Sequence, residues 1–210
     1  MNTHIDFTIL KPGATNDQVE ALCKTAIEKE YAAVCVPPHY VSMVKTILSN
    51  QTYKPQICTV IGFPHGMQSW NVKETESLEC IQHGATELDI VSNTSMVKNG
   101  DWKAWHEEIS AFTSVCKQHG VISKLIIETS LLSVEEIDKI CELVQDTDLD
   151  FVKTSTGFVG DGAKLEIVRR MRKLLPSRFR IKASGGIRDI EKARAFIDAG
   201  ADRIGTSTAL

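Results

Sequence analysis

The sequence predicts an α/β protein that folds as a (β/α)8 barrel over residues 1–210. Short apolar runs typical of β-strands alternate with longer segments of helical periodicity along the whole chain. Eight such runs recur about every 28 residues, which is the spacing of a strand–helix barrel. The runs Val34–Val36, Thr59–Ile61 and Leu125–Ile127 have no charged face, as expected of strands covered by helices. A doubly wound open sheet is the competing arrangement, because periodicity alone does not distinguish the two.

The individual elements follow from these runs and from helix-capping patterns. Strands are expected at Ile5–Leu10, Ala32–Pro37, Gln56–Phe63, Glu87–Ser92, Lys124–Thr129, Asp150–Thr154, Arg180–Ala183 and Asp202–Gly205. Two helices begin with capping boxes, Thr15-x-x-Gln18 and Ser133-x-x-Glu136, in which a side-chain oxygen accepts from an otherwise unpaired amide. Helix ends are expected at three glycines that precede strands: Gly84, Gly120 and Gly200.

The residues after the last predicted strand, 206–210, are too few to form an eighth covering helix. We therefore expect that helix to be missing or very short, which leaves one outer seam of the barrel uncovered by the chain itself. A short tail, a partner subunit or a truncated chain would each account for this feature.

The composition indicates a soluble cytoplasmic protein and excludes several functional classes. The chain is 42% hydrophobic and 24% charged, and its net charge of −3 gives no basic surface for nucleic acid or for a membrane. No apolar stretch approaches the roughly 20 residues needed to cross a bilayer, and the N-terminus does not resemble a secretion signal. The six cysteines are dispersed and several lie in apolar runs, which is typical of buried, reduced thiols.

The most informative residues are ionisable side chains in or beside the apolar runs: Asp6, Asp89, Lys124, Lys153 and Lys182. A lone charge is costly to bury unless it is paired or neutralised. Strand alternation gives Lys153 and Lys182 matching positions on neighbouring strands. Both are then expected to point into the barrel near its C-terminal end, where this fold builds its active sites. Lys124 opens its run, so its place in the sequence predicts a position near the opposite end.

Two lysines and an aspartate in a narrow interior suggest Schiff-base chemistry. An amine attacks a carbonyl only in its neutral form, and a free lysine, with a pKa of about 10.4, is almost fully protonated at pH 7. Desolvation and a neighbouring ammonium both favour the neutral amine. Asp89 could then transfer protons as a carbinolamine forms and dehydrates. The alternative is that these lysines form ordinary ion pairs or extend from the strand ends into solvent.

Glycine-rich loops after the last three strands suggest a phosphate site. These loops are Gly157–Gly162, Gly185–Gly186 and Gly205–Ser207. Glycine lets backbone amides approach an anion closely, and barrels of this class often bind phosphate after their last strands. The first loop is not a dinucleotide-binding motif, because its glycines have the wrong order and it follows a late strand.

Motifs for metal-dependent or hydrolytic chemistry are missing from the sequence. The six histidines show no metal-ligand spacing among themselves or with cysteine, so no metal site is expected. Neither a G-x-S-x-G nucleophile elbow nor a Walker loop occurs. His65, at the end of a predicted strand, is the one histidine that is a candidate for lining a site.

Essentially the whole chain resembles the deoxyribose-phosphate aldolase family, which comprises class I, Schiff-base aldolases with a (β/α)8, or TIM, barrel. The most specific segments are F-V-K-T-S-T-G-F at residues 151–158 and K-A-S-G-G-I-R at residues 182–188. The resemblance implies reversible cleavage of 2-deoxy-D-ribose 5-phosphate to D-glyceraldehyde 3-phosphate and acetaldehyde. It also implies that no metal or organic cofactor is needed, because the iminium itself acts as the electron sink.

The resemblance further assigns roles to individual residues. Lys153 matches the Schiff-base lysine, Lys182 the second lysine that keeps the nucleophile neutral, and Asp89 the acid/base aspartate. Asp6 and Lys124 match the polar residues that complete the proton relay. The residues that match the phosphate-binding loops are Gly157, Gly185, Gly186, Gly205 and Ser207. We also expect a homodimer or a higher homo-oligomer.

Two other functions remain open at this point. One is another phosphosugar enzyme that uses the same lysine differently, such as a transaldolase-like activity. The other is a weakened or purely binding barrel, which the short C-terminus would explain. A covalent adduct on Lys153 after borohydride reduction would distinguish an aldolase from a binding protein.

Overall fold

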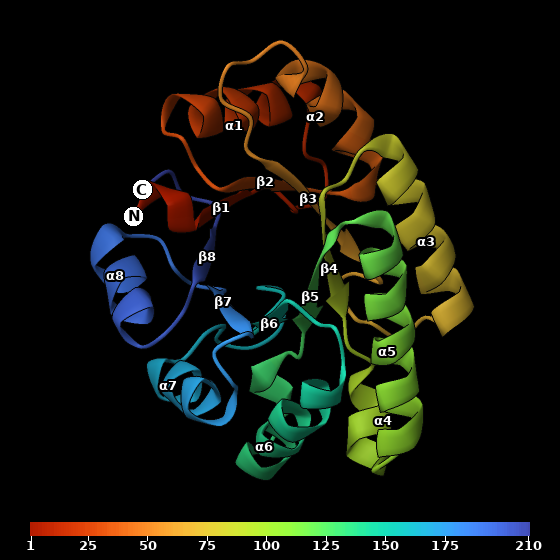
Figure 1. Cartoon of the computed structure of the whole chain (residues 1–210). Coiled ribbons are helices and arrows are strands. Elements are labelled where there is room, and N and C mark those ends of the chain that lie inside the picture. The colour runs from red at the N-terminus through yellow and green to blue at the C-terminus, as the bar shows by residue number, and fades with distance from the viewer.

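The computed structural model describes residues 1–210 and forms a closed barrel of eight parallel strands in sequential order (Figure 1). The last strand pairs with the first, with Asp6 opposite Gly205, so no sheet edge remains. The strands are β1 (Ile5–Thr8), β2 (Ala33–Val36), β3 (Gln56–Ile61), β4 (Glu87–Val91), β5 (Ile122–Ile126), β6 (Phe151–Lys153), β7 (Arg180–Ser184) and β8 (Arg203–Thr206). This architecture confirms the predicted (β/α)8 barrel and excludes the doubly wound open sheet.

Helices follow the first seven strands and surround the barrel (Figure 1). They are α1 (Asn16–Glu28), α2 (Val41–Leu48), α3 (Trp70–His83), α4 (Thr94–Asn99), α5 (Trp102–His119), α6 (Val134–Leu143), α7 (Leu165–Leu174) and α8 (Ile190–Asp198), with α4 and α5 both after β4. The two predicted capping boxes start α1 and α6. Gly84 and Gly120 end α3 and α5 in the left-handed conformation, as expected of helix-terminal glycines. None of the helices is both long and apolar enough to cross a lipid bilayer.

No helix follows β8, as the sequence predicts. The final residues instead return to the start of β2, where the Tyr31 hydroxyl donates to the carbonyl oxygen of Leu210 at 2.6 Å. The Leu210 amide donates back to the same hydroxyl at 3.0 Å. Both termini therefore lie together between α1 and α8 (Figure 1).

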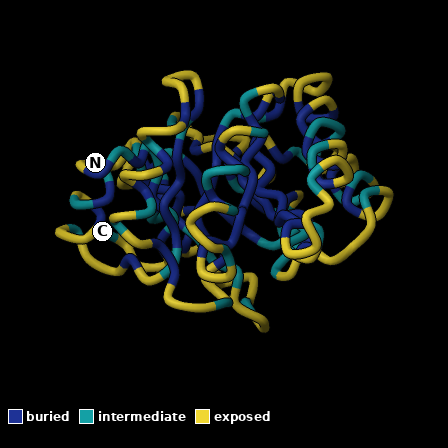
Figure 2. The backbone as a smooth tube through the Cα atoms, turned by 90° about the horizontal axis from the view of Figure 1, so that it is seen from below, coloured by how far each residue is buried: buried dark blue, intermediate teal, exposed yellow.

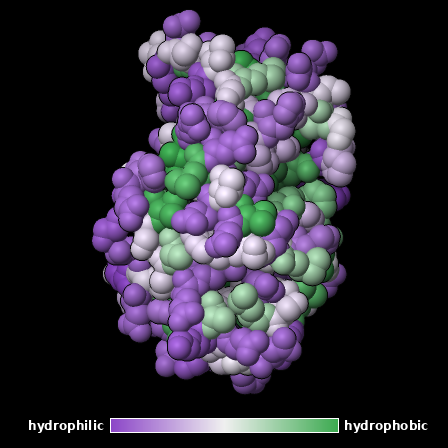
Figure 3. Space-filling model, turned by 90° about the vertical axis from the view of Figure 1, so that its right-hand side faces the viewer, coloured by the Kyte–Doolittle hydropathy of each residue, from purple (hydrophilic) through white to green (hydrophobic).

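The strands are buried on both faces, but the two faces differ in chemistry. Outward side chains such as Val34, Leu125 and Ile181 pack under the helices in the main apolar core. Figure 2 shows this buried centre surrounded by exposed outer segments, and Figure 3 shows that the outer face over α3, α4 and α5 is largely polar. Inside the barrel, β2 and β3 present only small or apolar groups, among them Cys35 and Cys58. Any interior charge must therefore come from the other strands.

All six cysteines are buried and free of disulfides, which confirms the expectation of buried thiols. Burial raises the pKa of Cys80, Cys116 and Cys141 to about 12, with a further contribution from nearby carboxylates. These thiols are consequently protonated at neutral pH and act as small apolar side chains.

The fifth strand corrects one expectation. The sequence predicted a strand over Lys124–Thr129, whereas β5 begins at Ile122 and ends at Ile126. Lys124 therefore lies in the middle of the strand, directly opposite Asp89 of β4, and not near the far end of the barrel. The predicted start was wrong because Ser123 is polar and interrupts the apolar pattern at the beginning of the strand. Its amide and hydroxyl bond to Asp150, which allows Ser123 to be buried.

Candidate active site

Seven charged side chains meet inside the barrel, and strand alternation explains why all of them point inward. Four are cations and three are carboxylates: Lys124, Lys153, Lys182, Arg203, Asp6, Glu87 and Asp89. The five predicted catalytic residues are all in this set, and all five are buried. The structure thus brings together every strand-borne charge that the sequence singled out.

Asp89 is the centre of the cluster. Its Oδ2 accepts hydrogen bonds from the Lys153 and Lys182 ammonium groups at 2.7 Å and 2.8 Å. Its Oδ1 accepts from Lys124 at 2.8 Å and from the Cys58 thiol at 3.1 Å. Burial would raise the pKa of Asp89, but the three lysines outweigh it and hold the pKa well below its usual range. The carboxylate is therefore ionised, and each of its oxygens accepts two hydrogen bonds.

Asp6 forms a second ionic centre on β1. It lies 2.5 Å from the Lys182 ammonium and accepts a hydrogen bond from the Arg203 guanidinium. Burial would raise the pKa of Asp6, but Lys182, Lys124 and Arg203 together lower it. Lys182 bridges Asp6 and Asp89. Burial would lower its pKa, yet the two carboxylates raise it above the usual lysine range, so Lys182 remains an ammonium.

Lys124 occupies the deepest position and is fully buried. It lies 2.5 Å from Glu87 and 2.8 Å from Asp89. Burial would lower its pKa, but Asp89, Cys58 and Glu87 raise it well above the usual value. Lys124 is thus a permanent cation in contact with Asp89, and sequence position alone could not indicate this.

Acid should weaken the fold through this cluster. The unfolded-state pKa of aspartate is about 3.9, and the folded-state pKa values of Asp6 and Asp89 lie below it. Their contribution is therefore complete above about pH 4 and is lost as the pH falls toward the folded-state values. We expect the free energy of unfolding, measured by urea denaturation, to fall progressively below about pH 4. A denaturation midpoint that stays constant from about pH 5 to pH 3 would contradict the electrostatic account.

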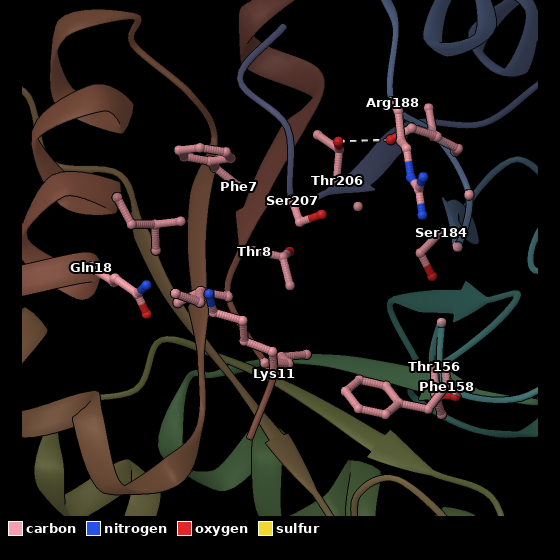
Figure 4. A pocket seen from close by; sticks show the side chains of 18 of the residues that line it. Phe7, Thr8, Lys11, Gln18, Thr156, Phe158, Ser184, Arg188, Thr206 and Ser207 are labelled. Atoms are coloured by element: carbon pink, nitrogen blue, oxygen red, sulfur yellow. Dashed lines mark hydrogen bonds between the residues drawn. The ribbon is translucent and has the colours of Figure 1, made fainter. Parts of the chain in front are cut away.

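A cavity of about 610 Å³ opens beside this cluster, at the C-terminal end of the strands (Figure 4). Of the seven charged interior residues, only Lys153 lines it. Lys11 and Arg188, both exposed, also face the cavity. The Lys153 amine is therefore in contact with a buried carboxylate on one side and with ligand-sized space on the other.

The five predicted phosphate-binding residues all line this cavity: Gly157, Gly185, Gly186, Gly205 and Ser207. The amides of Gly157, Gly185, Gly186 and Ser207 donate to no acceptor of the chain. Gly157, Gly185 and Gly186 have positive φ angles of 83°, 90° and 72°, which place consecutive amides around a concave surface. Unpaired amides at a cavity wall are suited to bind an anion.

Gly205 contributes space. It lies in β8, and a Cβ atom there would lie 2.9 Å from Cβ of Ser184 and 3.3 Å from Cε of Lys182. A side chain at this position would displace the second lysine. His65, the histidine that the sequence offered as a site residue, is exposed and does not line the cavity.

Comparison with known proteins identifies the family. The sequence profile of the DeoC/LacD family of aldolases matches residues 3–209. The chain belongs to this family.

Several members of the aldolase family are similar over nearly the whole chain. The deoxyribose-phosphate aldolase of Caldanaerobacter subterraneus is 44% identical over 204 residues, which cover 97% of this chain and 87% of that protein. The crystal structure of a putative deoxyribose-phosphate aldolase from Coccidioides immitis superposes with a TM-score of 0.93 at 39% identity, covering 98% of this chain and 81% of the other. The tetrameric deoxyribose phosphate aldolase of Aeropyrum pernix superposes with a TM-score of 0.91 at 32% identity, covering 99% and 87%.

Two interior residues of this aldolase were missed by sequence reasoning. Arg203 donates to both Asp6 and Glu87, and Glu87 lies beside Lys124. Glu87 is two residues before Asp89 and therefore shares its strand face, which was an available signal. Arg203 follows Asp202 at the start of β8, and two consecutive charged residues there suggest exposure to solvent. The sequence therefore gave no sign that Arg203 points into the barrel.

The aldolase interior also contains groups that could in principle bind a metal. Cys35, Cys58 and Asp89 form one such set, and Asp6, Cys58 and Glu87 form another. The carboxylates of both sets already contact ammonium or guanidinium groups. A divalent cation would have to displace those cations, so the donor set fits an ionic network better than a metal centre.

Proposed function

We propose that this protein is a class I aldolase that reversibly cleaves 2-deoxy-D-ribose 5-phosphate to D-glyceraldehyde 3-phosphate and acetaldehyde through a Schiff base on Lys153. One observation carries the assignment of the nucleophile. Lys153 is the interior amine that reaches the cavity, and it shares its carboxylate partner with two other lysines. Its relatives of known name support the reaction.

Lys153 differs from the other interior cations in its number of carboxylate partners. Lys124 lies within 4 Å of three carboxylates, and Lys182 and Arg203 each contact two, whereas Lys153 contacts only Asp89. Because four cations face three carboxylates, release of one proton removes the excess charge. Lys153 has the fewest carboxylate partners and is the only one of these cations that lines the cavity, so it is the amine proposed to act as the nucleophile.

The proposed reaction begins when the neutral Lys153 amine attacks C1 of the open-chain sugar. The resulting carbinolamine loses water and becomes an iminium. Loss of the proton from the C3 hydroxyl then breaks the C2–C3 bond, and the electron pair moves toward the iminium nitrogen. This step releases glyceraldehyde 3-phosphate and leaves an enamine. Protonation of C2 and hydrolysis of the iminium release acetaldehyde and restore the amine.

Asp89 is proposed to accept and return the protons of these steps. With three ammonium neighbours it is a poor base, because they lower its pKa. Once Lys153 is neutral or carries substrate, one of those charges is removed or moved, and Asp89 becomes more basic. Lys182 and Lys124 remain charged and hold the carboxylate in place. Asp6 in turn holds Lys182.

The phosphate is proposed to bind at the unpaired amides of Gly157, Gly185, Gly186 and Ser207. These amides supply hydrogen bonds with fixed directions. Gly205 supplies the space between this wall and Lys182.

Borohydride trapping tests the assignment. Incubation with acetaldehyde or deoxyribose 5-phosphate, followed by reduction and peptide mass mapping, should place an adduct on Lys153. A folded protein that forms no adduct, or forms it elsewhere, would contradict the proposal. A coupled assay for glyceraldehyde 3-phosphate then separates this activity from a transaldolase-like one.

Lys182→Leu should shift the pH dependence of trapping upward. Without Lys182 the interior holds equal numbers of cations and carboxylates, so Lys153 keeps its proton to higher pH. We expect the trapping rate at pH 7 to fall about 10- to 100-fold and its half-maximum to move to higher pH. Lys182→Arg, which keeps the charge, is the control and should retain the position of the half-maximum. An unchanged profile in Lys182→Leu would contradict the neighbouring-charge account.

A homo-oligomer in the cytoplasm is also proposed. The tetrameric relative from Aeropyrum pernix supports association of this fold. Helix α3 exposes Val72 and Leu78, with 54% and 41% of their surface accessible, which is apolar area available for a contact. Light scattering after size-exclusion chromatography measures the state directly, and a monomeric mass would contradict the oligomer.

A further inference from the structure

Glu128, two residues after β5, is a buried carboxylate that the proposed mechanism leaves without a role. Only 2% of its surface is exposed. Its backbone adopts the left-handed conformation, with φ 52° and ψ 67°. A residue other than glycine keeps this conformation only where surrounding contacts hold it, and such residues cluster at functional sites. The contacts of Glu128 therefore indicate the role of this backbone conformation.

The Glu128 carboxylate binds the loop that follows β6. Its Oε2 accepts hydrogen bonds from both the amide of Thr156, at 3.1 Å, and the Thr156 hydroxyl. Its Oε1 accepts from the Ser130 hydroxyl at 3.3 Å. The Thr156 hydroxyl, in turn, accepts from the amide of Phe158 at 3.1 Å. A continuous chain of hydrogen bonds thus runs from Glu128 through Thr156 to Phe158.

This chain encloses Gly157, whose amide is one of the unpaired donors at the cavity wall. Thr156, Gly157 and Phe158 all line the cavity, whereas Glu128 does not. Figure 4 shows Thr156 and Phe158 side by side at the cavity, across from Lys11. Because the residues on both sides of Gly157 are fixed through Thr156, the direction of the Gly157 amide is fixed as well.

We propose that Glu128 is a positioning residue that holds the Thr156–Phe158 turn in the shape that binds the phosphate end of the substrate. This inference rests on the proposed function. The left-handed backbone of Glu128 directs its carboxylate behind Thr156, where it can accept from the amide and the hydroxyl together. Glu128 consequently governs affinity for the phosphorylated substrate and does not take part in the covalent steps at Lys153.

Glu128→Gln is the most direct test. Glutamine keeps the length of the side chain, but its neutral amide oxygen accepts more weakly from Thr156 than a carboxylate does, and its NH2 group cannot accept from Ser130. We expect KM for 2-deoxy-D-ribose 5-phosphate to rise about tenfold and kcat to change less than about threefold. KM for unphosphorylated 2-deoxy-D-ribose should remain within about twofold of wild type. An unchanged KM for the phosphorylated sugar, or an equal rise for both sugars, would overturn the inference.

Variants at Thr156 test the route by which Glu128 acts. Thr156→Val removes the hydroxyl and should raise KM for the phosphorylated sugar as Glu128→Gln does, whereas Thr156→Ser keeps the hydroxyl and should raise KM less than Thr156→Val does. For the double variant Glu128→Gln/Thr156→Val, KM for the phosphorylated sugar should be no higher than the higher of the two single-variant values. The reason is that the two residues belong to one chain of hydrogen bonds. A double variant whose increase in KM equals the product of the two single-variant increases would overturn this route. If Glu128→Gln fails to fold by circular dichroism, the Val and Ser variants of Thr156 decide the matter: equal KM values would overturn the inference.

Acetaldehyde trapping separates this inference from the proposed function. Acetaldehyde has no phosphate, so wild type and Glu128→Gln should form the borohydride-stable adduct on Lys153 at the same rate. Absence of the adduct in wild type would count against the aldolase assignment itself. Loss of the adduct in the variant alone would show that Glu128 acts at the amine, and would overturn its role at the phosphate end.

Discussion

Lys153→Met should abolish Schiff-base formation and aldol cleavage while the barrel remains folded. Methionine has nearly the length of lysine but no amine, and no other interior amine lines the cavity. We expect kcat to fall at least about 10⁴-fold, because the covalent route is lost. The free energy of unfolding should change by no more than about 2 kcal/mol, because Lys153 is the interior cation with the fewest carboxylate partners.

Three measurements check this result: the glyceraldehyde 3-phosphate assay, the peptide mass map after borohydride reduction, and thermal unfolding. Lys164→Met is the matched control, because its side chain is half exposed and forms only a 3.9 Å surface ion pair with Asp161. The control should keep full activity and its adduct on Lys153. Retained turnover in Lys153→Met, or an adduct transferred to another lysine, would show that the nucleophile has been misassigned.

Asp89→Asn should damage both catalysis and stability. The substitution leaves Lys124, Lys153 and Lys182 around a neutral amide, so buried cations lose their shared counter-charge. Removing one member of a buried ion cluster typically costs about 3–5 kcal/mol. We also expect kcat to fall at least about 10³-fold with little change in KM, because the proton transfers lose their acceptor and substrate contacts remain.

Urea denaturation and steady-state kinetics measure the two effects separately. Asp138→Asn is the matched surface control. Its carboxylate pairs with Arg170 on the outside of the molecule, and loss of an exposed pair should cost no more than about 1 kcal/mol. A rise in KM alone in Asp89→Asn would indicate a binding role for Asp89. Wild-type stability would contradict its place at the centre of the charge cluster.

The barrel itself could be predicted because its signals are local. Alternation of apolar runs with helical segments, and the capping residues Thr15 and Ser133, depend only on neighbours in the sequence. The matching places of Lys153 and Lys182 followed from strand alternation, and the structure pairs them directly in register. Glycines at three successive strand ends likewise predicted where the unpaired amides would be.

The position of Lys124 and the role of Arg203 could not be predicted in this way. Lys124 was placed near the wrong end because its strand begins at Ile122. The next residue, Ser123, is polar, and its burial depends on Asp150, which lies just before β6. Arg203 follows Asp202 at the start of its strand, and its two carboxylate partners lie on β1 and β4. Neither feature leaves a trace among the neighbouring residues of the chain.

The amino-acid sequence determined which side chains point inward and which strand ends carry glycine, since both follow from backbone geometry within a few residues. The tertiary structure decided which lysine has few carboxylate partners and access to the cavity, and which carboxylate is shared by three cations. It also placed the buried Glu128 carboxylate against Thr156 in the loop that follows β6. The physical reason is closure of the barrel, which brings Asp6 and Arg203, 197 positions apart, into contact in a medium where charges interact strongly.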